Sequence, residues 1–171
     1  MRGLIISLCV VVAACTPKTV TNNGVYRDAA SPIYSIAAFD QRRLAGRWDQ
    51  VAAFAPRTNV ECRRGGAEFA RKAGALHLTY RLCLSGRNMA GAGTVAATGP
   101  GRFAIAGKDG IDQDWWVLWV DEGYRTLVIG NPSGTFGFIL NQGKTLPADR
   151  LQAAREVLDF NGYNVETLVV Y

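Results

Sequence analysis

The sequence has little of the chemistry that metal sites and most enzymes use. It holds one histidine, His77, and four cysteines, without a CxxC pair or a His cluster. A metal site needs several such ligands together, and nucleophilic catalysis needs a nucleophile paired with a base. We therefore expect no metal, no cofactor and no catalytic residue, and we expect His77 to occupy a half-exposed strand position.

Basic clusters and membrane-length apolar runs are also lacking. Lys and Arg number 19 against 14 Asp and Glu, but they are scattered and not interleaved with stacking aromatic residues. This excludes a nucleic-acid surface. The apolar run LIISLCVVVAA at 4–14 has eleven residues, too few to cross a bilayer core ~30 Å thick. What remains is a chain with 49% hydrophobic and 19% charged residues, the composition of one ordinary globular domain.

The N-terminus predicts export. Arg2, the apolar run and small residues before Cys15 have the order of a signal peptide. VAAC at 12–15 resembles the lipobox of bacterial lipoproteins, which implies that residues 1–14 are removed and that Cys15 is acylated, for example with palmitate. Because Thr16 follows rather than Asp, the resemblance implies the outer membrane, with the domain facing the periplasm. An ordinary cleaved signal peptide is the alternative.

The residues after the cleavage site divide into a linker and a domain. Residues 15–30 lack periodicity and carry Pro, Gly and paired Asn, as a flexible tether does. We expect this segment to connect the lipid to one domain over residues 31–171.

Two cysteines remain after signal cleavage and lipid attachment, Cys62 and Cys83. An oxidising periplasm allows a disulfide to persist. The pair is symmetric about RKAGA at 71–75, and a four-residue turn there would place Ala70 opposite Ala75 and the two cysteines opposite each other. The spacing therefore predicts a disulfide that joins the strands of a β-hairpin. Metal binding by this pair is the weaker alternative.

Short apolar or alternating runs, separated by turn residues, occupy the middle of the chain. Such evenly spaced runs predict an antiparallel sandwich or barrel, and their short connections favour an up-and-down order. A helical pattern follows at 146–162 and a last strand at 165–171, and we expect the helix to lie outside a closed barrel. The expected strands are 44–55, 60–70, 75–84, 88–98, 102–107, 114–121, 124–130 and 134–142.

Two motifs carry a family resemblance. Gly46-x-Trp48 begins the first expected strand, and WVLWVDEGYRTLVIGNPSGTFGFILNQGKTLP is followed by the helix. Together they resemble bacterial outer-membrane lipocalins over about residues 40–171, more weakly in the middle. Asp121 matches the acid of the lipocalin Thr-Asp-Tyr turn, although Val120 replaces its Thr. The resemblance implies an all-β fold: an eight-stranded antiparallel up-and-down β-barrel with a C-terminal α-helix and a final short strand.

The resemblance also assigns a barrel floor. Trp48 closes one end of the barrel, and Gly46 lets the backbone pass close beneath the ring. In lipocalins an Arg after the last barrel strand packs across this Trp, but Gln142 stands at the matching place. Arg42, Arg43 and Lys144 are all open as replacements. Trp48 as an ordinary core residue, without a cavity above it, is the alternative.

An apolar lining follows from strand alternation and from the inward face that the resemblance implies. Gln50 and Thr126 are the expected headgroup contacts, and Tyr80 and Arg81 are weaker candidates. A register error of one residue would exchange the two faces of a strand. The residues expected to bind the ligand are Gln50, Ala52, Phe54, Trp115, Val117, Trp119, Thr126, Val128, Phe136, Phe138 and Leu140.

These features predict a lipid-anchored lipocalin that binds or carries a small hydrophobic molecule, such as a fatty acid or lysophospholipid. An envelope lipoprotein whose barrel is filled by its own side chains is one alternative. A lipocalin-fold enzyme that acts on a lipid is another, but the chain lacks a Ser/His/Asp order. The expected partners are this ligand and the membrane, with a homodimer left open.

Overall fold

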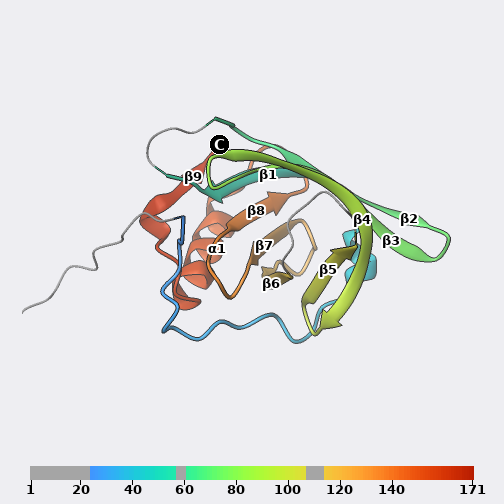
Figure 1. Cartoon of the computed structure of the whole chain (residues 1–171), viewed down its shortest axis with the longest axis horizontal. Coiled ribbons are helices and arrows are strands. Elements are labelled where there is room, and N and C mark those ends of the chain that lie inside the picture. Colours follow the sequence, from blue (N-terminus) through green and yellow to red (C-terminus); the bar gives the residue numbers. More distant parts are fainter. Residues whose placement is uncertain (1–23, 57–60, 107–113) are drawn as a thin grey trace, which may run out of the picture.

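A computed structural model describes residues 24–56, 61–106 and 114–171. Eight strands form an antiparallel barrel in sequential order, and β1 closes it by pairing with both β8 and β2. The helix α1 lies against one side of the barrel, and the β2–β3 hairpin reaches beyond it on the other (Figure 1). The barrel strands are β1 (Gly46–Phe54), β2 (Gly66–Lys72), β3 (Ala75–Leu84), β4 (Arg87–Gly99), β5 (Arg102–Ala106), β6 (Trp115–Val120), β7 (Thr126–Gly130) and β8 (Gly137–Asn141).

The β2–β3 turn is shorter than the sequence analysis expected. Ala73 and Gly74 both have positive φ, 48° and 82°, as a two-residue type I′ hairpin turn requires. Ala70 therefore pairs with His77, and the predicted pairing with Ala75 is wrong. Because β2 begins only at Gly66, the first part of the expected strand 60–70 lies outside the ladder.

The helix and the last strand pack on the outside of the barrel, as predicted. Helix α1 (Ala148–Phe160) lies against β6 and β7 and buries Ala154 and Leu158 in the cluster of outward-facing barrel residues. Gly162, with φ of 81°, follows the helix as the expected left-handed stop. Strand β9 (Leu168–Val170) pairs with β1. A short 3-10 helix, η2 (Val165–Thr167), joins α1 to β9.

The described part of the expected tether is ordered against the domain. Tyr26 is buried and stacks on Phe54 with a centroid distance of 5.6 Å. The Arg27 guanidinium donates to the backbone carbonyls of Asn161 (2.7 Å), Pro132 (3.0 Å) and Ser31. The tether prediction is therefore wrong for residues 24–30, because Tyr26 and Arg27 bind to the helix end and the β7–β8 turn. The predicted signal peptide and Cys15 lie outside the described residues.

Within the described residues, no helix has the length and apolarity needed to span a membrane.

Candidate functional site

The barrel interior holds a connected cluster of aromatic rings centred on Trp115. Its ring centroid lies 5.1 Å from that of Phe138, 5.4 Å from Tyr80 and 5.7 Å from Phe103. Phe136 extends the cluster, 5.9 Å from Phe138. These rings come from β3, β5, β6 and the β8 region, so the barrel closure brings together residues that are far apart in sequence.

Side chains fill the middle of the barrel. Trp115 and Phe138 have no surface that a water molecule can reach, and Phe103 is 1% exposed. Leu78 and Ile129, which belong to the same interior cluster, are also fully buried. A ligand that reaches the centre of the barrel must therefore displace side chains.

The structure divides the residues predicted to line the barrel into two groups. Opposite residues in a ladder share a face, and Gln50 pairs with Leu140 of the interior cluster. Gln50, Trp115, Val117, Phe136, Phe138 and Leu140 face inward. For Ala52, Phe54, Trp119, Thr126 and Val128 the predicted inward orientation is wrong.

Two β-bulges cause three of these errors. The pairing of β1 shifts between Gln50 and Ala52, and that of β6 shifts between Val117 and Trp119. One extra residue in a strand exchanges its two faces beyond the bulge. As a result Ala52, Phe54 and Trp119 pack under the helix side of the barrel instead of inside it.

The β7 assignment is out of register by one residue. Leu127 pairs with the inward Leu140, and both belong to the interior cluster. Val128 therefore faces outward. Thr126 Oγ1 donates to Asn141 Oδ1 at 2.9 Å and accepts from Arg150 Nη1 of α1 at 2.6 Å, so its hydroxyl joins the barrel to the helix and is not a headgroup contact.

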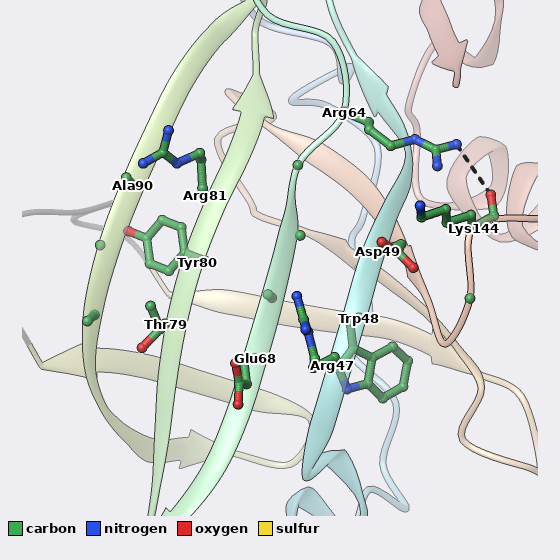
Figure 2. Close-up of a pocket in the computed structure, with 16 residues that line it drawn as sticks. Arg47, Trp48, Asp49, Arg64, Glu68, Thr79, Tyr80, Arg81, Ala90 and Lys144 are labelled. Carbon is green, nitrogen blue, oxygen red and sulfur yellow. Dashed lines mark hydrogen bonds between the residues drawn. The ribbon is translucent and has the colours of Figure 1, made fainter.

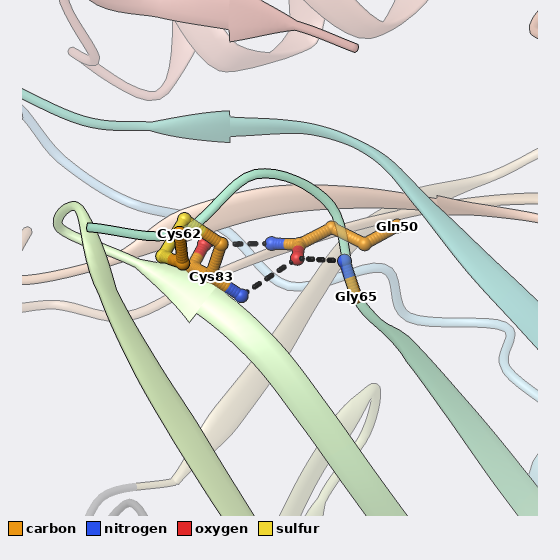
Figure 3. Close-up of a disulfide and its surroundings, with 4 residues drawn as sticks. All are labelled: Gln50, Cys62, Gly65 and Cys83. Carbon is orange, nitrogen blue, oxygen red and sulfur yellow. Dashed lines mark hydrogen bonds between the residues drawn. A yellow bond between two sulfur atoms is a disulfide. The ribbon is translucent and has the colours of Figure 1, made fainter. Parts of the chain in front are cut away.

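Gln50 also has a structural role. Its Nε2 donates to the Cys83 carbonyl at 2.8 Å, and its Oε1 accepts from the N–H groups of Cys83 (2.8 Å) and Gly65 (3.1 Å) (Figure 3). The amide therefore binds Cys83 of β3 and the segment that precedes β2. It is not available as the headgroup contact that the sequence analysis expected.

The predicted disulfide between Cys62 and Cys83 is confirmed, with a Cα–Cα distance of 5.5 Å. Cys83 lies on β3, but Cys62 lies in the segment before β2 rather than opposite it in the ladder. Glu61 in this segment donates its N–H to the Gly86 carbonyl at 2.8 Å. The register that predicted the pair is wrong, yet the segment returns close enough to β3 for the bridge.

Trp48 belongs to the interior cluster and is 2% exposed. Its Nε1 donates to the Leu44 carbonyl at 2.8 Å, at the end of the 3-10 helix η1 (Gln41–Leu44) that precedes β1. Gly46 has φ of 130°, and a Cβ at this position would have no atom within 4 Å. The glycine is thus required by its backbone conformation, and the expected close passage beneath the ring is wrong.

The turn after β6 is at the same end of the barrel. Asp121 accepts hydrogen bonds from the N–H groups of Arg125 (2.5 Å) and Thr126 (2.6 Å) and from Arg125 Nε (3.1 Å). Burial alone would raise the pKa of Asp121, but these donors outweigh it and hold the pKa below its usual value. Tyr124, in this turn, accepts at its hydroxyl from the Asp40 N–H at 2.9 Å.

None of the proposed replacements for the lipocalin Arg packs on Trp48 in the described part of the chain. Arg43 lies over the Tyr124 ring, 3.8 Å from its centroid, and Arg42 pairs with Asp40 at 2.8 Å. Gln142 is exposed. The cation–π contact at this end of the barrel is therefore made with the turn tyrosine.

A groove of about 1050 Å³ lies on the outer face of β1–β4. Small residues, including Gly65, Gly66 and Gly91, contribute to its walls. Both signs of charge border it, which suits a surface groove and not an apolar ligand cavity. Its charged side chains are Arg47, Asp49, Arg64, Glu68, Arg81 and Lys144 (Figure 2).

Several interior residues were missed or undervalued in the sequence analysis. Tyr80, treated as a weaker candidate, is 3% exposed and faces the cluster, whereas Arg81 is exposed. Phe69 and Phe103 were not proposed. The signal for β3 was present, because every second residue from Leu76 to Leu84 is a large apolar or aromatic one and all of these face inward. Within the described chain, no three His, Cys, Asp or Glu side chains could together hold a metal ion.

The fold is shared with solved lipocalin structures of low sequence identity. Insecticyanin from the tobacco hornworm Manduca sexta matches with a TM-score of 0.56 and 15% identity, over 81% of this chain and 86% of that one. The cockroach allergen Per a 4 matches with a TM-score of 0.54 and 14% identity, over 77% and 87%. The siderocalin Ex-FABP matches with a TM-score of 0.55 and 13% identity, over 74% and 92%.

A search of curated proteins finds no match to this sequence. The family model described as a lipocalin-like domain matches residues 39–171, which include all nine strands and the helix. The chain therefore belongs to the lipocalin-like family.

Proposed function

We propose that the protein is a lipid-anchored lipocalin that binds a small hydrophobic molecule at the bacterial outer membrane. The observation that carries the proposal is the apolar, aromatic interior around Trp115. Among the described residues the buried charged side chains are Arg27 and Asp121. Arg27 binds the helix end and Asp121 caps a turn, so both lie outside this interior. Such a lining suits an uncharged, mostly apolar ligand.

A related structure supports a ligand-binding role for the barrel. The siderocalin Ex-FABP is described as functioning through dual ligand specificities. Binding rather than catalysis also fits the chemistry here, since Cys62 and Cys83 are bridged and His77 lies half-buried on β3. We propose no catalytic residue.

The anchor is supported by the sequence VAAC at 12–15 and by the place where the first described residues bind. The first described residues bind beside the end of α1, where Asp28 donates its N–H to the Gly162 carbonyl at 2.9 Å. The exposed rings of Tyr34 (55%) and Phe160 (71%) lie at this place, with centroids 5.9 Å apart. Aromatic side chains favour the membrane interface, which fits an anchor that emerges here.

A second candidate function has its own observation. Because Trp115 and Phe138 have no water-accessible surface, the barrel is filled by its own side chains, as in a structural envelope lipoprotein that binds no ligand. The two functions differ in whether the interior can open.

Native mass spectrometry and a displacement titration would separate them. Mature protein purified from bacterial membranes should carry a co-purified hydrophobic molecule, and should bind a neutral fluorescent probe, N-phenyl-1-naphthylamine, with a stoichiometry of one. An outward control, Trp116→Phe, should bind the probe as the parent does, because Trp116 lies under Arg102 on the outer face. No retained molecule and no probe binding would favour the structural role.

A further inference from the structure

The indole N–H of Trp115 is an unpaired donor inside the barrel. The Nε1 atom is buried and has no hydrogen-bond partner, although the side chain is 0% exposed. Buried polar groups in native proteins are nearly always paired, because an unpaired one has lost its hydrogen bonds to water. Within the described residues this N–H has no acceptor, so it is free to donate to a molecule that enters the barrel.

Two other donors of the interior, those of Trp48 and Gln50, are paired, and Tyr171 Oη at the edge of the cluster is the other buried side-chain atom of the described residues without a partner. Trp48 Nε1 donates to the Leu44 carbonyl at 2.8 Å, and Gln50 Nε2 donates to the Cys83 carbonyl at 2.8 Å. The Trp115 N–H differs from them because the rings packed nearest to it belong to Tyr80, Phe103 and Phe138. A ligand that enters the cluster by displacing one of these rings would meet this N–H.

We propose that Trp115 Nε1 donates the hydrogen bond that orients the ligand, and that this ligand is a neutral molecule with a carbonyl or ester oxygen on a hydrophobic skeleton. The inference rests on the proposed ligand-binding function and narrows its ligand class. A single N–H satisfies one neutral acceptor. A carboxylate would be buried beside it without a counter-charge, because the buried charged residues of the described chain, Arg27 and Asp121, lie elsewhere. A fatty-acid anion therefore fits this site less well than the matching ketone or ester.

Tyr80 is the ring whose movement would make room for the ligand. It pairs across the ladder with Gly91 of β4, and Leu78 pairs with Gly93. The inner face of β4 therefore presents no side chain directly opposite Tyr80 or Leu78. On its other side Tyr80 pairs with Ala67 of β2, whereas Phe138 pairs with Ala53 and Ile129 of the strands on either side, and these three partners are members of the buried core.

The test uses three competitors, each with twelve carbon atoms: 2-dodecanone, dodecanoate and dodecane. Each compound is titrated against N-phenyl-1-naphthylamine bound to the full mature protein, and its displacement of the dye is measured at pH 8, where dodecanoate is ionised. We expect 2-dodecanone to bind most tightly. Trp115→Phe should weaken 2-dodecanone by about 2- to 10-fold, the range for one neutral hydrogen bond, and leave dodecane unchanged. Trp116→Phe, the same substitution on the outward neighbour, should change neither.

An equal loss for the ketone and the alkane in Trp115→Phe would overturn the inference, because the ring would then act only by packing. Tightest binding of dodecanoate would overturn it as well. If none of the three competitors binds the parent, the proposed ligand-binding function itself fails, which is a separate outcome.

A second measurement uses the parent protein and does not depend on the folding of a core variant. The indole ¹⁵N–¹H signals of the four tryptophans can be followed in the parent protein and assigned there by through-bond and through-space correlations, with Trp116→Phe as a check on its outward neighbour. The Trp115 N–H signal should move downfield on adding 2-dodecanone and not on adding dodecane. The same movement with both compounds would contradict a hydrogen bond to the ligand.

Discussion

At the scale of single residues, Gly46 was expected to allow a close backbone passage beneath Trp48, but the structure requires glycine there because of its positive φ. The glycine has φ of 130° with open space around it. Its neighbour Trp48 is buried and bonded to the Leu44 carbonyl. The motif therefore sets the direction in which the chain leaves η1 so that the ring enters the barrel.

Gly46→Ala should destabilise the protein by about 1–3 kcal/mol, because a residue with a side chain is strained at this φ. Gly74→Asn is the control, since Asn tolerates the left-handed conformation that the hairpin turn uses (φ of 82°). Urea melts of both variants would measure the difference. Equal stability of Gly46→Ala and the parent would show that the strand entrance can adopt another conformation.

Asp121 predicts a dependence of stability on pH. Its folded pKa lies below the usual value, so its contribution is present above the unfolded pKa of about 3.9 and is lost as the pH falls through the folded pKa. Asp121→Asn should be less stable than the parent by about 1–2 kcal/mol at pH 7, the difference between charged and neutral hydrogen bonds. The gap should begin to narrow below about pH 4 and close as the pH falls through the lower, folded pKa.

Denaturant midpoints from pH 7 to pH 3 would check this. Glu122→Gln is the matched control, because the neighbouring side chain is exposed and should leave the pH profile unchanged. A constant gap between Asp121→Asn and the parent at every pH would mean that the carboxylate charge contributes nothing.

At the scale of elements, the sequence predicts most of the strands and the helix. It predicts only in part which side chains point into the barrel. Turn residues and alternation locate the strands and the helix, and the recurring apolar residues of β3 locate its inner face. Ala52 and Trp119 were misplaced because a bulge follows from tertiary pairing with β8 and β7. Nothing in the local pattern marks such an extra residue, since both faces of these strands are apolar.

The segment between β1 and β2 depends on two linked interactions, the disulfide and the Gln50 amide. Gln50→Ala would leave the Cys83 backbone groups and the Gly65 N–H without this partner. Reduction of Cys62–Cys83, which closes a loop of about 20 residues, should lower stability by ~3 kcal/mol. We expect Gln50→Ala to lower it by about 1–3 kcal/mol while leaving probe affinity unchanged.

Urea melts with and without reductant, together with N-phenyl-1-naphthylamine titration, would test this role. Gln142→Ala offers the control, because that amide-bearing side chain is exposed. Loss of probe binding in Gln50→Ala at full stability would restore Gln50 as a ligand contact.

At the scale of the whole molecule, the place where the N-terminal segment binds the domain determines which surface of the domain would face the membrane. Residues from Tyr26 onward are bound to the helix end and the β7–β8 turn. If Cys15 is lipidated as proposed, residues 24–30 would not belong to a free linker, and the linker would be shorter than composition predicted. With the domain held close to its proposed anchor, the exposed Tyr34 and Phe160 rings would lie near the lipid surface.

The anchor itself predicts where the protein is found in the cell. Cys15→Ser removes the thiol to which the diacylglyceryl group would be attached, and the protein should move from the outer-membrane pellet to the soluble periplasmic fraction and lose labelling by radioactive palmitate. Cys9→Ser is the matched control, because Cys9 lies within the apolar run that the signal peptidase would remove. That variant should still be labelled and should still pellet, since two or more acyl chains hold a protein stably on a bilayer. If Cys15→Ser remains in the outer-membrane pellet, another part of the molecule holds it there, and the exposed pair Tyr34 and Phe160 would be the first surface to substitute.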